Sequence, residues 1–191
     1  VNEGSPYAVF TLTKPAGAAA TYVTLGLRND SDPSTADAVL GVDTVNAGAV
    51  VPLQYFDGAQ WRDYVAGTVI EVPGTGLLVR TGVGNDSPYE GPETFQLAAT
   101  VTNSAGTPSG AVSLGTATIL DDGTGAWYPD NGTGNPDPSR PLNDDRPVRV
   151  NNIEVNEASP YAVFTVTGIG NQPVVLALQN DNDPLTTNAL L

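Results

Sequence analysis

The side chains that could do chemistry in this chain are carboxylates. The sequence contains no histidine and no cysteine, which removes the usual zinc ligands and the Ser-His-Asp and Cys-His catalytic arrangements. It has 21 Asp and Glu residues against 7 Lys and Arg, for a net charge of -14. Such a balance would suit a merely soluble, halotolerant surface, but it also suits calcium, which binds several oxygen ligands at once. We expect Ca²⁺ as the ligand.

Candidate calcium ligands stand where expected strands begin or end. Glu3 precedes the first long strand, and Asp121 and Asp122 follow the last one. Loops from alternate connections of an antiparallel sandwich meet at one end, where carboxylates repel each other unless a cation offsets their charge. The predicted ligands in the first repeat are Glu3, Asp30, Asp32, Asp86, Glu90, Glu93, Asp121 and Asp122, and those in the second are Glu157, Asp181 and Asp183.

The same residue types also form turns, because Asp and Asn side chains bond their own backbone. For Asp57 and Asp130 this turn interpretation is preferred, whereas for Glu3, Asp121 and Asp122 calcium is preferred. Both interpretations stay open for Asp30, Asp32, Asp86, Glu90 and Glu93. The aspartate-rich loops are not EF-hands, since Pro33 and Pro184 interrupt them and Gly41 stands where the closing Glu would be.

Several function classes are excluded by these observations. A net charge of -14 argues against nucleic acid, and no apolar run is long enough to cross a bilayer. Glu90 and Glu93 are the carboxylate pair considered for glycoside hydrolysis, but they lie too close together on a turn to flank a substrate. We expect no enzyme and no catalytic residues.

An internal repeat organises the chain. Residues 1–13 (VNEGSPYAVFTLT) and 155–167 (VNEASPYAVFTVT) are identical at 11 of 13 positions. Residues 25–33 (LGLRNDSDP) also match 176–184 (LALQNDNDP), after a three-residue deletion in the intervening loop. Repeats of this kind indicate an array of similar domains. The segment PVRVNNIE precedes the second copy and has no counterpart before the first, so we expect the polypeptide to continue on both sides.

Three parts are predicted from the repeat and the composition. Residues 1–123 form one repeat with a truncated first strand, and residues 148–191 form the start of the next. Residues 124–147 are rich in Pro, Gly and Asp and are predicted to be a linker, pinned in places by its aspartates.

Short alternating segments broken by Gly, Pro, Asn and Asp predict an all-β fold. An immunoglobulin-like antiparallel sandwich accommodates seven or eight such strands, repeated in tandem. The Asp57-Gly58 dipeptide predicts a hairpin. The expected strands cover residues 9–13, 22–27, 50–56, 61–65, 68–72, 77–81, 94–102 and 115–120.

Four motifs in order give the chain a resemblance to a known family. VNEGSPYAVFTLT, LQYFDGAQW, YEGPETFQL and ATILDDGTG together resemble the Calx-β-like repeats of giant bacterial surface adhesins, over residues 1–123 and again from about 148. The resemblance implies an immunoglobulin-like sandwich, calcium at strand ends and domain junctions, secretion to the bacterial cell surface, and a spacer or adhesive role.

The function expected from these observations is structural. The chain is interpreted as a calcium-stabilised extender repeat of a secreted bacterial adhesin or extracellular fibre that supports cell adhesion or biofilm. The alternative is a calcium-dependent module that binds a glycan or a protein on a cell surface. The expected partners are neighbouring repeats of the same chain and other copies in a fibre, together with a cell-surface or glycan ligand.

A fragment of residues 148–191 should be unfolded by circular dichroism, with or without calcium. Its two or three strands present Val163, Val166, Leu176 and Leu178 inward with no second sheet to cover them, so burial cannot overcome chain entropy. A stably folded fragment would mean that the domain boundary is misplaced.

Overall fold

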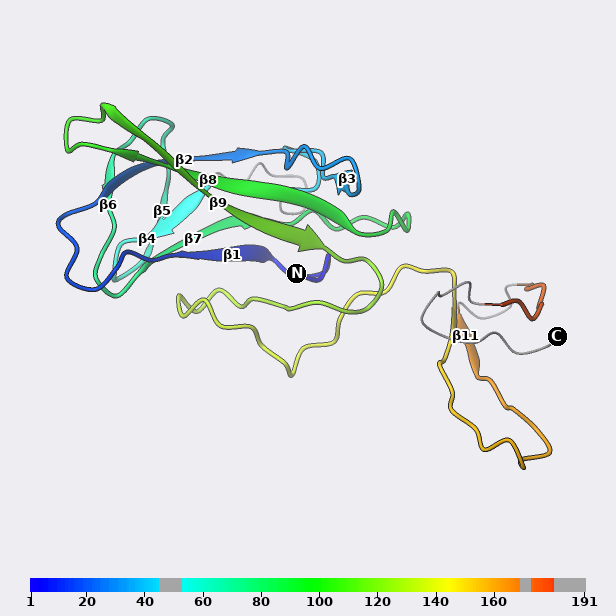
Figure 1. The fold of residues 1–191 in the computed structure, drawn as a ribbon. Coiled ribbons are helices and arrows are strands. Elements are labelled where there is room, and N and C mark those ends of the chain that lie inside the picture. Colours follow the sequence, from blue (N-terminus) through cyan, green and yellow to red (C-terminus); the bar gives the residue numbers. More distant parts are fainter. Residues whose placement is uncertain (45–52, 169–172, 181–191) are drawn as a thin grey trace. The chain divides into compact units, whose positions relative to one another are not determined.

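The protein is an all-β chain with two separate units. The computed structural model describes residues 1–44, 53–168 and 173–180, and divides the chain into Val1–Arg146 and Pro147–Leu191. The described residues form strands and turns and contain no helix, which confirms the all-β prediction (Figure 1). None of them therefore forms a helix that could cross a membrane.

One sheet of the first unit contains four antiparallel strands. Its order is β1 (Tyr7–Leu12), β7 (Leu77–Gly82), β4 (Gln54–Phe56) and β5 (Trp61–Asp63). The predicted hairpin is confirmed: Gly58 turns the chain between β4 and β5 with a φ of 96°, and the Asp57 carboxylate accepts hydrogen bonds from the N–H groups of Ala59 and Gln60.

The other sheet contains five strands. Its order is β3 (Ala36–Asp37), β8 (Glu93–Thr102), β2 (Tyr22–Arg28) and β6 (Ile70–Glu71), and β9 (Pro108–Ile119) also pairs with β8. The short pairing of β3 with β8 is parallel and departs from the antiparallel expectation. β9 begins seven residues earlier than predicted, because a turn at Asn103–Thr107 joins β8 and β9 into one long hairpin.

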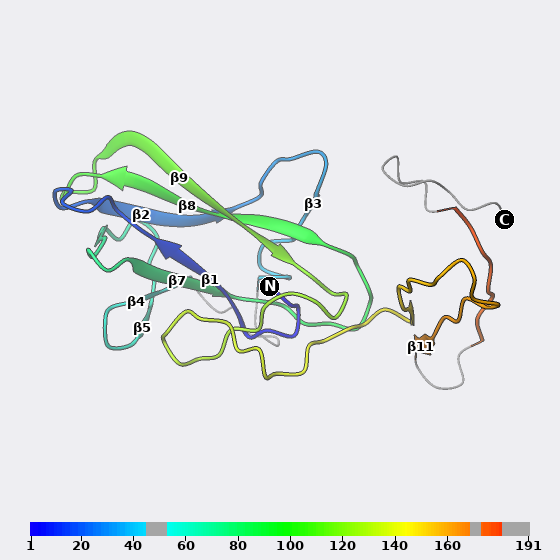
Figure 2. The same cartoon turned by 60° about the horizontal axis from the view of Figure 1, so that its bottom comes forward.

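The two sheets form two layers that share an apolar core (Figure 2). Successive side chains of a strand point to opposite faces, so every second residue of β2 and β8 faces the other layer. The buried core of this region is formed by Val23, Leu25, Tyr64, Ile70, Val72, Leu77, Val79, Leu97 and Ala99. A second buried cluster, of Ala8, Ala38, Val83, Phe95 and Ile119, is formed by β1, β8, β9 and neighbouring loops.

The segment 124–146 belongs to the first unit and is docked on it. Backbone and side-chain hydrogen bonds attach its start to residues 2–5: Trp127 Nε1 donates to the Gly4 carbonyl over 3.1 Å, and the Tyr128 N–H donates to Ser5 Oγ over 2.9 Å. Further along, Asp130 forms an ion pair with Arg80, whose side chain is only 4% exposed. The predicted linker is thus pinned, and the buried guanidinium gains a counter-charge.

In the described part of the second unit, residues 147–168 and 173–180, two short strands form an antiparallel pair. β10 (Val148–Val150) pairs antiparallel with β11 (Val166–Gly168). Leu176, the repeat counterpart of the core residue Leu25, is 69% exposed, whereas Leu25 is 8% exposed. An apolar side chain that is buried in the first unit therefore has an exposed counterpart in the second.

Candidate metal centre

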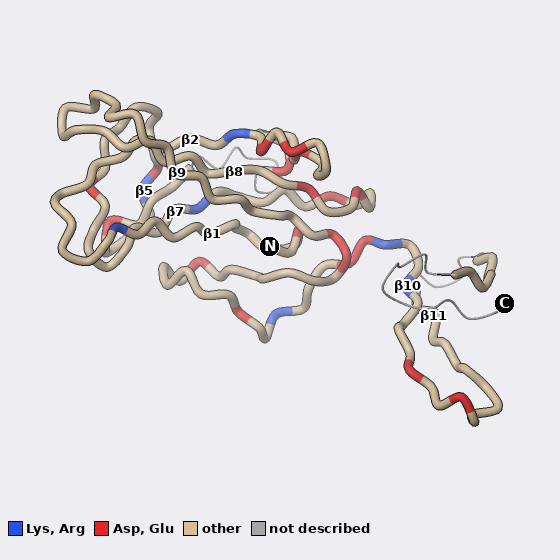
Figure 3. The backbone as a smooth tube through the Cα atoms, viewed as in Figure 1, with Lys and Arg blue, Asp and Glu red and all other residues tan. Residues whose placement is uncertain are grey.

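Acidic side chains gather at one end of the first unit. Figure 3, which traces the backbone, shows acidic residues on the segments that follow β2, β7 and β9, and further acidic residues elsewhere in the unit. Two groups of three carboxylates have oxygen atoms within 4.8 Å of one another: Glu3 with Asp121 and Asp145, and Asp43 with Glu90 and Glu93. We call them the junction cluster and the loop cluster.

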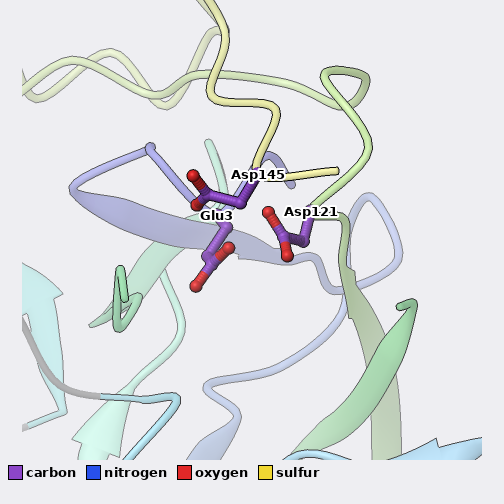
Figure 4. Close-up of side chains that lie close together, drawn as sticks. All are labelled: Glu3, Asp121 and Asp145. Carbon is purple, nitrogen blue, oxygen red and sulfur yellow. The ribbon is translucent and has the colours of Figure 1, made fainter. Parts of the chain in front are cut away.

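The junction cluster combines three distant parts of the chain (Figure 4). Glu3 comes from the residues before β1, Asp121 from the second position after β9, and Asp145 from the end of the docked segment. A short parallel ladder sets the first two side by side: the Leu120 N–H donates to the Val1 carbonyl over 2.8 Å, and the Glu3 N–H donates to the Leu120 carbonyl over 2.9 Å.

Asn2 brings the third carboxylate to the cluster. Its fully buried carboxamide donates to the carbonyls of Thr124 and Asn143 and accepts hydrogen bonds from the N–H groups of Gly4 and Asn143. These four bonds satisfy the buried amide and hold residue 143 against residue 2. Asp145, two residues further, is thereby brought to Glu3 and Asp121.

The junction cluster contains buried oxygen atoms that lack a donor. Glu3 is 8% exposed and Asp121 is 4% exposed. Glu3 Oε2 and Asp121 Oδ1 are each buried without a hydrogen-bond partner, although the other oxygens accept bonds from the N–H groups of Asp86 and Glu90. Buried polar atoms are normally satisfied, so two buried carboxylate oxygens without a protein donor need either a shared proton or a cation, which makes this cluster a candidate metal site.

The electrostatics of Glu3 agree with this geometry. Burial raises the pKa of Glu3 to about 8, because the charged form loses hydration. Sharing of a proton with Asp121 is the second cause, and the negative charges of Asp121 and Asp86 add to it, while the Asp86 N–H acts in the opposite direction. A bound cation would remove the need for that proton.

The loop cluster adjoins the same space. A cavity of about 10 Å³ is lined by Glu3 and Asp121 of the junction cluster and by Asp43, Glu90 and Glu93. Burial, followed by the negative charge of Asp43, raises the pKa of Glu93 to about 7. The volume has room for one water molecule or one ion and excludes a sugar ring.

Among the described residues, the other predicted ligands lie outside both clusters. Asp30, Asp32 and Asp122 accept hydrogen bonds within their own turns or from nearby hydroxyl groups, as in the turn interpretation. These bonds lower the pKa of all three, chiefly through the Asp32 N–H for Asp30 and hydroxyl donors for the other two. Glu157 is exposed in the second unit, and Asp181 and Asp183 fall outside the described residues.

Sequence reasoning missed three residues of the site. Asp43 lies in a loop with no strand signal, and Asp145 lies in the segment predicted to be a linker. Asn2 carries no charge, so a search for carboxylate ligands does not point to it. A signal for Asn2 and Glu3 was present in the repeat, since VNE recurs at 155–157.

Without metal, the free energy of unfolding should fall as the pH rises from about 5 to about 8. The folded state keeps a proton on Glu3 up to a pKa of about 8, whereas the unfolded chain releases it near 4.5, so folding is favoured at the acidic end. Glu3→Gln should flatten this slope and stabilise the chelated protein at pH 8. The exposed Glu71→Gln is the control, and chemical denaturation in chelator at both pH values is the measurement. An unchanged slope in Glu3→Gln would contradict the assignment.

Comparison with known proteins identifies no relative of this chain. No protein-family model, no curated protein and no solved structure matches the chain. The function proposed below therefore rests on the geometry of the site and on the internal repeat.

Proposed function

We propose that this chain is a calcium-stabilised structural extender repeat of a secreted bacterial adhesin or extracellular fibre, supporting cell adhesion or biofilm. The observation that carries the proposal is the junction cluster, in which buried carboxylate oxygens of Glu3 and Asp121 lack a donor beside Asp145. An extender needs domains that are stiff at their ends, and the cluster joins the start of the first unit to its last residues.

Calcium fits the donor set better than other common metals. All ligands available in the two clusters are hard oxygens, and the chain has no histidine or cysteine to favour zinc or copper. Calcium accepts irregular geometries with several carboxylates, whereas magnesium requires a near-ideal octahedron. A divalent charge would offset the repulsion that raises the pKa of Glu3 and Glu93.

The origin of the ligands favours a mechanical role. Glu3 lies near the start of the first unit, and Asp121 follows its last strand, β9. Asp145 lies two residues before Pro147, where the second unit begins. One ion bound to all three would cross-link the entry of the chain to the segment that leads into the second unit. The internal repeat of the sequence, the two-layered all-β fold and the resemblance to adhesin repeats support the same role. A cavity too small for a sugar gives no support to glycan binding at this point.

Calcium should raise the melting temperature of the full chain. It binds the folded carboxylates far better than the unfolded chain, so a hundredfold excess over Kd should add about 2.7 kcal/mol to the free energy of unfolding. Calorimetry in calcium and in chelator measures the shift, with potassium chloride of equal ionic strength as the control. Equal melting temperatures in calcium and in chelator would contradict the proposal.

Loss of a junction carboxylate should weaken calcium binding. Asp121→Asn and Asp145→Asn should each raise Kd roughly tenfold or more, because each removes a charged ligand from a shared site. Asp122→Asn and Asp57→Asn should leave Kd unchanged, since both carboxylates are engaged in their own turns. Titration calorimetry compares the four variants, and a larger effect at Asp122 than at Asp121 would show that the ion sits elsewhere.

A further inference from the structure

The two ends of the first unit meet at one point. Two hydrogen bonds join Asn2 to Asn143: Asn2 Nδ2 donates to the Asn143 carbonyl, and the Asn143 N–H donates to Asn2 Oδ1, each over 3.1 Å. Beside them, Glu3 and Asp145 approach each other in the junction cluster. Tension that pulls the start of the unit away from its last residues therefore acts first on these contacts, before it reaches the residues between them.

The chain between the end of β9 and this point forms a closed loop, residues 123–143. An isolated antiparallel bridge pairs Asp122 with Asp144 at its base. Arg146 adds a second closing contact, because its Nη2 donates to the Asp122 carbonyl over 2.6 Å. In Figure 1 the loop is the yellow-green trace that runs away from the end of β9 and returns. The length of the loop therefore adds nothing to the distance between its ends.

The closed loop is held on the sandwich by contacts outside the strand ladders. The structure describes the whole loop, and none of its residues belongs to a strand. Trp127 donates to the backbone before β1, and Asp130 pairs with Arg80. A Cβ atom on Gly134 would lie 2.8 Å from Leu78 Cδ2, so the loop backbone lies directly on the sheet there. Such contacts can break while the strands of both sheets stay paired.

The base of the loop and the sandwich would be loaded in different directions. Asp122 and Asp144 run antiparallel and would be pulled apart from the same end, so their closing contacts would open one after another. Asn2 and Leu120 instead lie in the short parallel ladder described above. Opposed pulling on the start of one segment and the end of the other loads both hydrogen bonds of that ladder at once. The base of the loop is therefore expected to open at a lower force than the sandwich.

We propose that the closed loop is a reserve of length that the first unit releases under tension. Opening its base frees residues 123–143, roughly 70 Å of extended chain at about 3.4 Å per residue, while the two sheets stay folded. The inference rests on the proposed function, because an extender repeat in a fibre is under tension. An ion at the junction cluster would bridge Glu3 and Asp145 and would hold the loop closed up to a higher force.

A disulfide across the base tests the proposal in the full chain, which has no cysteine of its own. The variant combines Asp122→Cys with Asp144→Cys, since directly paired strand positions have the separation that a disulfide requires. Optical tweezers stretch the chain through cysteine-free tags at both termini, with the disulfide reduced and then oxidised. The reduced form is the matched control, and any extension of the second unit is common to both forms.

The unmodified chain and the reduced variant should each lengthen by roughly 70 Å before the sandwich unfolds. Oxidation should abolish this lengthening and leave the unfolding of the sandwich, because the disulfide holds the two ends of the loop together. In the unmodified chain at constant force, the closed loop should last roughly tenfold longer or more in calcium than in chelator, because the ion binds the closed form.

Absence of the lengthening in the unmodified chain, or its persistence in the oxidised variant, would overturn the proposal. Circular dichroism of both forms confirms that the sandwich is folded, so a missing event counts against the loop. The two proposals fail separately. A melting temperature that rises in calcium without any lengthening contradicts the closed loop alone. Lengthening that is the same in calcium and in chelator, with equal melting temperatures, supports the loop and contradicts the calcium-stabilised function.

Discussion

Burial of like charges at the junction cluster is the constraint on which the first unit depends. Glu3 and Asp121 bring two carboxylates into a space with little water, and each keeps an oxygen without a donor. Such an arrangement is costly unless a proton or a cation compensates it. Without metal, the raised pKa of Glu3 keeps a proton on its carboxyl group and so reduces the repulsion. A divalent ion would compensate both negative charges at once.

The same constraint explains why the segment 124–146 belongs to the first unit. A sandwich ending at residue 123 would leave the amide of Asn2 and the guanidinium of Arg80 buried without several of their partners. The segment supplies them and carries Asp145 to the junction cluster. An ion bound at the junction cluster would therefore couple to the docking of this segment, since its ligands would come from both.

Apolar surface is incompletely covered in both units. The first unit has an apolar groove of about 250 Å³ between β1 and β9, and the second unit exposes side chains whose counterparts the first unit buries. Side chains with the same place in the repeat therefore differ in burial between the two units, as Leu25 and Leu176 do.

The sequence by itself determined the all-β class, the Asp57-Gly58 hairpin, the internal repeat and the acidic, oxygen-only chemistry, because these follow from residue type and local spacing. It also placed Glu3 and Asp121 at strand ends, where they meet. Only the tertiary structure decided that Asp122 turns away while Asp43 and Asp145 join the carboxylates. Adjacent residues at the end of a strand point in different directions, and contacts such as that of Asn2 with Asn143 join residues that no local pattern relates.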